Sequence, residues 1–263
     1  MRQEEKSKKA PNRIGTQHDG AYSISSFTPY LLHFHLERKL SVIGSAKRQG
    51  IFTLILTLGM LWAATSEAAQ PRPQKVRLDQ AIGKGIVRAE FQGMGSSTGD
   101  SILLRIANLT ASPLEVEIAP GTVLEDPSAS CQDMIVERVR GIPKAEYSFQ
   151  PQDHILLPGK ETEEYVLLAY CLNFDRDNPT PKTRFRLKGF GYPEIQKLFA
   201  ILPQASEAER SIEAIQIAIW VILQDVTWGE LQSRLSLTEA DIADARSLLQ
   251  RTGIETSTKN LFQ

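Results

Sequence analysis

The sequence predicts an α+β protein, in which a small antiparallel β-sandwich of immunoglobulin-like size precedes a helical subdomain of three or four helices. Two observations lead to this prediction. Between about residues 80 and 175, apolar residues recur at every second position and turn signals separate the runs, as in short strands. Between about residues 190 and 255, apolar residues recur at every third or fourth position, as in helices.

The strand pattern is clearest in LEVEI, residues 114–118, where three aliphatic residues alternate with two glutamates. SILLRIAN, residues 101–108, alternates in the same way. EEYVLLAYCLNF, residues 163–174, is apolar on both faces, as expected of a central strand. Further strands are expected within 85–91, 133–139 and 154–158, and short strands at this spacing are typical of a sandwich.

Helix signals follow a polar boundary with two prolines, NFDRDNPTPKT, residues 173–183. Pro193 suits the first turn of a helix over 192–202. Ser206 and Glu209 have capping-box spacing and predict the start of a helix over 206–225. Thr238 is the expected N-cap of a last helix that stops at Gly253, and a shorter helix is expected within 226–235.

The N-terminal part predicts export. An uncharged apolar run, Ile51 to Ala64, follows the basic pair Lys47-Arg48, and the small residues Ser66 and Ala68 suit a cleavage site. This is the pattern of a signal peptide over 51–68, and the run is shorter than the roughly 20 residues that span a bilayer. The protein is therefore expected to be periplasmic, on the cell surface or extracellular. The alternative is an uncleaved membrane anchor.

Residues 1–50 precede this segment and carry more basic than acidic residues without an apolar period. We interpret them either as a disordered leader or as the result of a mis-assigned start, with translation beginning near Leu40 or Val42. Neither interpretation includes them in the fold. A linker is expected at PRPQ, residues 71–74, between the signal peptide and the β-sandwich.

Composition argues against several function classes. In 69–263 acidic residues outnumber basic ones and no basic stripe is present, which argues against nucleic acid as a partner. His154 is the only histidine there, so a catalytic triad or a multi-histidine metal site would depend on it alone. Asp175, Asp177 and Asn178 are interpreted as a solvated turn and not as a calcium loop. We therefore expect no enzyme activity, no metal and no cofactor.

Gln216 is the most informative residue of the helical part. It lies in EAIQIAIW, residues 213–220, the most apolar run of the second half of the chain. A helix that is apolar all round is buried all round, so the amide should be buried and hydrogen-bonded. We expect it to face the end of the strand YVLLAYCL, residues 165–172. A structural polar contact between the two subdomains would explain it.

A resemblance suggests a second explanation. Tyr170-Cys171-Leu172 resembles the aromatic-Cys-apolar motif of the thioester domains of Gram-positive surface adhesins, and Ile215-Gln216-Ile217-Ala218-Ile219 with Trp220 resembles their glutamine motif. The resemblance implies an internal thioester, with sulfur from Cys171 and the acyl group from Gln216. Such a bond is an electrophile held ready for an amine on another molecule.

The two cysteines leave three alternatives open. Two cysteines in an exported chain often form a disulfide, here between Cys131 and Cys171. That bond would occupy the sulfur that a thioester needs. The remaining alternative is two free, buried thiols.

The function expected from these observations is an exported, non-catalytic binding or interaction module of the cell envelope. Its partner would be a protein or a glycan, and it would contact the membrane only through Ile51–Ala64 if that segment stays uncleaved. The alternative is covalent surface adhesion through a Cys171–Gln216 thioester.

Overall fold

The computed structural model describes residues 72–145 and 148–263. The expected leader over 1–50 and signal peptide over 51–68 lie outside the described residues. The strands in chain order are β1 (Gln74–Arg77), β2 (Val87–Gly93), β3 (Gly99–Asn108), β4 (Leu114–Glu117), β5 (Thr122–Glu125), β6 (Met134–Ala145), β7 (Ser148–Pro151), β8 (Ile155–Leu157), β9 (Thr162–Cys171) and β10 (Arg184–Phe190). The α-helices are α2 (Leu78–Gly83), α3 (Pro193–Ile201), α4 (Ile212–Gln224), α5 (Trp228–Arg234) and α6 (Glu239–Arg251).

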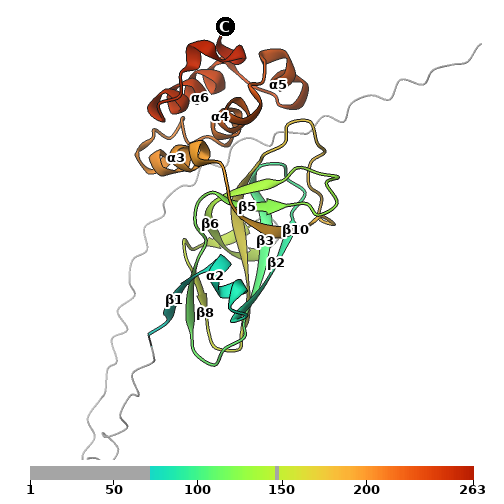
Figure 1. The fold of residues 1–263 in the computed structure, drawn as a ribbon, viewed down its shortest axis with the longest axis vertical. Coiled ribbons are helices and arrows are strands. Elements are labelled where there is room, and N and C mark those ends of the chain that lie inside the picture. Colours follow the sequence, from blue (N-terminus) through green and yellow to red (C-terminus); the bar gives the residue numbers. More distant parts are fainter. Residues whose placement is uncertain (1–71, 146–147) are drawn as a thin grey trace, which may run out of the picture. The chain divides into compact units, whose positions relative to one another are not determined.

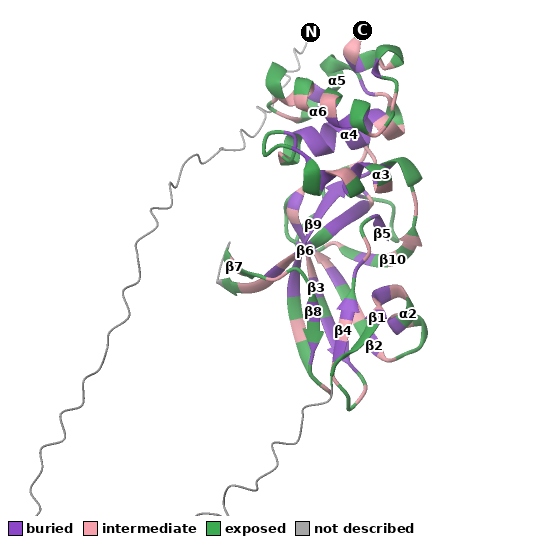
Figure 2. Ribbon diagram, turned by 90° about the vertical axis from the view of Figure 1, so that its left-hand side faces the viewer, coloured by how far each residue is buried: buried purple, intermediate pink, exposed green. Residues whose placement is uncertain are grey.

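The large sheet closes into an antiparallel barrel. Its strands are ordered β5-β10-β2-β3-β9-β6-β7, and β5 also pairs with β6. That last pairing joins the two ends of the series, so six strands form a ring. Figure 1 shows the strands together on one side of the C-terminal helices. The strand β7 extends from β6 as the second strand of a hairpin, which Figure 2 shows. A closed ring leaves few free strand edges, because each strand finds a partner on both sides.

The barrel corrects the predicted immunoglobulin-like sandwich. Sandwich and barrel both bury alternate residues, so the period-two pattern is the same in each. The difference lies in β10, which the sequence did not suggest as a strand. It pairs with β2 on one side and with β5 on the other, and thereby closes the ring. The α+β class, with helices after the strands, is confirmed.

A small second sheet and a short helix accompany the barrel. The sheet has the order β1-β4-β8, with β1 parallel to β4 and β4 antiparallel to β8. The strand β1 begins at Gln74, the last residue of the predicted linker PRPQ. Leu114 and Val116 of β4 are buried with Ile155 and Leu157 of β8, so the alternation in LEVEI is confirmed.

The helical part follows β10 and contains α3 to α6. Pro193 opens α3, Thr238 caps α6 through a capping box with Asp241, and Gly253 follows α6 with a φ of 81°. Ser206 and Glu209 form both capping-box hydrogen bonds, but a turn follows them and α4 begins only after its N-cap, Ser211. Within the described residues, the structure contains no helix with the length and hydrophobicity needed to cross a membrane.

Barrel and helices belong to one compact unit with a continuous core. Buried residues run along the strands of the barrel and through α4, as Figure 2 shows. Eight successive residues of α4, from Ala214 to Val221, are buried. Trp220 is 3% exposed and meets Phe174 edge-on at 4.9 Å between ring centroids. Trp228 is 36% exposed at the start of α5, so of these two tryptophans Trp220 is the deeply packed one.

Glu209 fastens the turn before α4 to the last helix, α6. Its carboxylate accepts hydrogen bonds from the Ser247 hydroxyl at 2.6 Å, from the Ser206 N–H at 2.8 Å and from the Arg251 guanidinium at 2.8 Å. These bonds, with that from Ser247 contributing most, lower the pKa of Glu209 to about 2. The folded protein therefore favours the ionised form of this side chain.

Glu209→Gln should lower the free energy of unfolding at neutral pH by about 1–3 kcal/mol, because one amide cannot replace a carboxylate that accepts three hydrogen bonds. The folded-state pKa is depressed from 4.5, so this contribution is present above pH 4.5 and is lost as the pH falls toward about 2. Urea unfolding at a series of pH values should show the difference between variant and wild type shrinking in that window. Glu207→Gln, at an exposed position of the same turn, is the matched control. A difference independent of pH would contradict the assignment.

Candidate functional site

The candidate site lies where β9 extends beyond the end of its neighbour β3. On one side, β9 pairs with β6 as far as the pair Met134 and Cys171. On the other side, its pairing with β3 ends at Gly99 and Ala169. The Leu172 N–H donates to the Asp133 carbonyl, toward β6. Because successive residues direct their backbone groups to opposite edges of a strand, those of Cys171 point to the edge that β3 has left.

Gln216 of α4 satisfies these open backbone groups. The Cys171 N–H donates to Gln216 Oε1 at 2.9 Å, and Gln216 Nε2 donates to the Cys171 carbonyl at 2.9 Å. The side-chain amide thus takes the place that one more residue of β3 would occupy. Gln216 is 1% exposed, which confirms that it is buried and faces the end of the strand. Two buried backbone groups depend on one side chain.

Two features place α4 against this strand end. Gly99, the first residue of β3, has a φ of +80°, and a Cβ atom there would lie 2.8 Å from Ile212 Cδ1. The glycine therefore lets the start of α4 approach the barrel. Farther along α4, Gln224 Oε1 accepts from the Phe174 N–H at 3.0 Å. Two glutamines of one helix bind backbone of one segment, 171–174.

The Cys171 thiol is enclosed beside this contact. Cys171 has no exposed surface. Its Sγ donates a hydrogen bond to the Ser97 carbonyl and lies 3.7 Å from Met134 Sδ. Burial raises the pKa of Cys171 well above the usual range of a thiol. The group is therefore a neutral thiol at physiological pH and not a thiolate.

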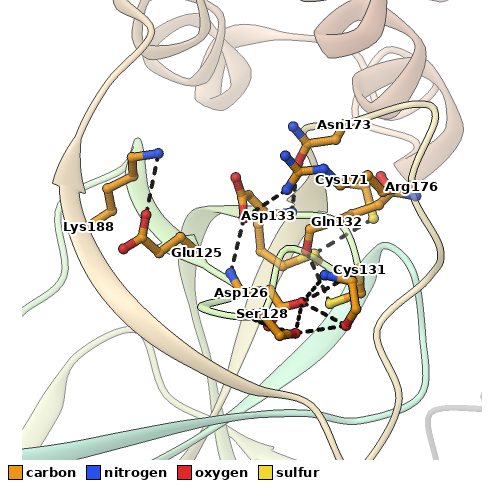
Figure 3. A network of polar contacts seen from close by, with 12 residues as sticks. Glu125, Asp126, Ser128, Cys131, Gln132, Asp133, Cys171, Asn173, Arg176 and Lys188 are labelled. Atoms are coloured by element: carbon orange, nitrogen blue, oxygen red, sulfur yellow. Dashed lines mark hydrogen bonds and ion pairs between the residues drawn. The ribbon is translucent and has the colours of Figure 1, made fainter.

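Cys131 lies on a loop held by Asp126. The Asp126 carboxylate accepts hydrogen bonds from the backbone N–H groups of Ser128, Ser130 and Cys131. Burial, and then the charge of Asp126, raises the pKa of Cys131 to about 11. Figure 3 shows this loop with Cys131 and, on a neighbouring segment, Cys171. The candidate disulfide between them is not formed in the structure, where both thiols are free and buried.

The segment after β9 is tied to the Cys131 loop. Asn173 Oδ1 accepts from the Asp133 N–H at 2.8 Å, and Arg176 lies 3.6 Å from the Asp133 carboxylate, as Figure 3 shows. The Gln132 N–H donates to the Asp177 carbonyl. The predicted boundary 173–183 is therefore an ordered connection between two parts of one site.

The other candidates from the sequence lie elsewhere. His154 is half exposed next to β8, and its Nδ1 lies 2.6 Å from the Asp153 carboxylate. Within 72–145 and 148–263, no group of three or more His, Cys, Asp or Glu residues is arranged to hold a metal ion. The sequence did not single out Ser97, the partner of the Cys171 thiol, or Gln224, whose position two helical turns after Gln216 was a usable signal.

Comparisons with protein-family models, with curated proteins and with solved structures give no match for this chain. The geometry of Cys171 and Gln216 is therefore the basis for a functional proposal.

Gln216→Met should destabilise the protein by about 2–4 kcal/mol, because it leaves two buried backbone groups of Cys171 unpaired. Gln216→Glu should destabilise it more at neutral pH, because a carboxylate would face the Cys171 carbonyl oxygen in a dry site. A protonated glutamate can accept from the N–H and donate to the carbonyl, as the amide does.

The pH dependence separates the two variants. Burial should raise the folded-state pKa of Glu at position 216 above its unfolded value of about 4.3. Its stabilising contacts are therefore present below that value and are lost as the pH rises through the folded-state pKa. Urea unfolding from acidic to neutral pH should show this loss for Gln216→Glu and not for Gln216→Met. Equal stability of the two variants at neutral pH would show that position 216 is solvated.

Proposed function

We propose that Cys171 and Gln216 form an internal thioester and that the chain is a module for covalent attachment to another molecule. The observation that supports this most directly is the paired contact between the Gln216 amide and the Cys171 backbone. Residues 45 positions apart meet in this contact. The resemblance of YCL and IQIAIW to the motifs of thioester domains names the same two residues.

The contact suits the chemistry of thioester formation. Cys171 Sγ would add to Gln216 Cδ, and the C–N bond would then break, so that Nε2 leaves as ammonia with the thiol proton. The Cys171 N–H already donates to Oε1, where negative charge develops during the addition. The Cys171 carbonyl already accepts from Nε2, the leaving group. The N–H and the carbonyl of Cys171 therefore hold the Gln216 amide beside the residue that carries the reacting sulfur.

Burial suits the storage of such a bond. Cys171 is fully enclosed and Gln216 nearly so, which keeps bulk water from the acyl carbon. An amine that reaches this carbon would displace the sulfur, form an amide bond with the Gln216 side chain and return a proton to the thiol. With export through the segment 51–68, the attachment would take place at the cell envelope.

A second candidate is a non-catalytic, non-covalent binding module for a protein or glycan at the cell envelope. The observation that favours it is that both polar atoms of the Gln216 amide are hydrogen-bonded and the Cys171 thiol is protonated and bonded to Ser97. In this case Gln216 is a structural link between helix and barrel.

Intact mass spectrometry of the native chain tests the proposal. We expect the mass to be lower than the sequence mass by one ammonia, because the thioester forms with loss of that molecule. The loss should persist in Cys131→Ser and disappear in Cys171→Ser and in Gln216→Ala. A disulfide would instead remove two hydrogens and would respond to a reductant. A wild-type chain of unchanged mass, with both thiols alkylated after denaturation, would refute the thioester.

A further inference from the structure

A polar pocket lies next to the Cys171–Gln216 pair. It has a volume of about 420 Å³, within the range of small-molecule sites. Its walls come from Ser97, from Asp177 and Asn178 after β9, from Trp220 on α4, and from the end of α5 with the following residue. Ser97 is the residue whose carbonyl accepts the Cys171 thiol proton, and Trp220 lies one turn after Gln216. The pocket therefore adjoins the pair on two sides.

One unsatisfied buried polar atom belongs to a residue that lines this pocket, and two others belong to neighbours of lining residues. Within the described residues, three buried side-chain polar atoms lack a hydrogen-bond partner, namely Trp220 Nε1, Gln132 Oε1 and Thr98 Oγ1. Trp220 lines the pocket, Thr98 follows the lining residue Ser97, and Gln132 donates through Nε2 to Asn178, another lining residue. An unpaired buried group costs on the order of 1–3 kcal/mol, so such groups commonly serve a ligand or water.

The charges on the walls give no net attraction to a cation or to an anion, because they are of opposite sign. Asp177 and Arg234 both line the pocket, and neither forms an ion pair with another described residue. Arg234 is held in place, because its Nη1 donates to the Arg176 carbonyl at 2.8 Å and its guanidinium lies 5.0 Å from the Phe174 ring centroid. A cation attracted by Asp177 would be repelled by Arg234, and an anion attracted by Arg234 would be repelled by Asp177. A neutral ligand with several hydrogen-bonding groups meets neither penalty.

We propose that this pocket binds a single neutral sugar unit. A sugar hydroxyl both donates and accepts, and several hydroxyls on one rigid ring can reach a carboxylate, an amide and a guanidinium at once. These are the groups that Asp177, Asn178 and Arg234 supply, with Trp220 beside them in the wall of the pocket. The site would hold the glycan part of a target beside the proposed thioester. Sugar binding itself depends only on the residues that line the pocket, and not on the thioester.

The test uses the full chain with Cys171→Ala, which cannot form a thioester. Methyl β-glucoside and methyl N-acetyl-β-glucosaminide are the probes, and the indole N–H resonance of Trp220 is the readout, assigned with Trp220→Phe. We expect a saturable shift of that resonance with at least one glycoside. Butylamine and acetate, a cation and an anion of similar size, should leave it in place.

A matched pair of variants locates the ligand. Asp177→Ala should weaken glycoside binding by about tenfold, because its carboxylate is lost from the wall. Asp175→Ala, at an exposed position of the same segment outside the pocket, should bind as the parent does. An unmoved Trp220 resonance with both glycosides, a shift with butylamine instead, or equal weakening by both variants would overturn the proposal. The mass of the wild-type chain reports on the thioester separately, so failure of one proposal does not decide the other.

Discussion

The contact between the Gln216 amide and the backbone of Cys171 joins the two halves of this protein. Strand β9 needs a hydrogen-bonding partner beyond Gly99, the first residue of β3, and helix α4 needs an apolar surface on which to bury nearly its whole circumference. Burial of α4 on the barrel brings Gln216 to the end of β9, and its side-chain amide then supplies the missing hydrogen-bonding partner. Loss of the amide would leave a carbonyl and an N–H unpaired in the core, where neither reaches water. The orientation of α4 on the barrel follows from this pairing.

Several parts of this arrangement could be predicted from the sequence. The period-two runs identified β2, β3, β4, β6, β8 and β9, and the helix signals identified α3, α5 and α6. The burial of Gln216 followed from the lack of a polar face on its helix. Its position near Cys171 followed because EEYVLLAYCLNF is the only strand pattern apolar on both faces. These inferences rest on local periodicity, which a single sequence contains.

The closure of the barrel could not be predicted in this way. It depends on RFRLKGF, residues 184–190, where charged residues alternate with apolar ones in a short run after two prolines. The partner β5 lies some sixty residues earlier, as the bond between Arg186 and Glu125 illustrates. Strand pairing over such a distance depends on which edges remain free after the other strands have paired. Periodicity does not encode that information, so a sandwich and a barrel remained equally compatible with the pattern.

The same geometry constrains which nucleophile the proposed thioester would accept. In the amide state, Gln216 accepts one hydrogen bond from Cys171 and donates another. Departure of ammonia would remove the donor and leave the Cys171 carbonyl unpaired, at a cost of about 1–3 kcal/mol. Attack by a primary amine would place an amide nitrogen at that position again, but its N–H would face the Cys171 carbonyl only in the cis form of the new amide bond, which costs about 2.5–4 kcal/mol. Hydrolysis to a carboxylate would place a negative charge against the carbonyl oxygen, and an alcohol would give an ester without a donor. The Cys171 carbonyl would thus oppose hydrolysis most, because only the carboxylate places a negative charge against it, whereas the trans amide and the ester each leave it unpaired.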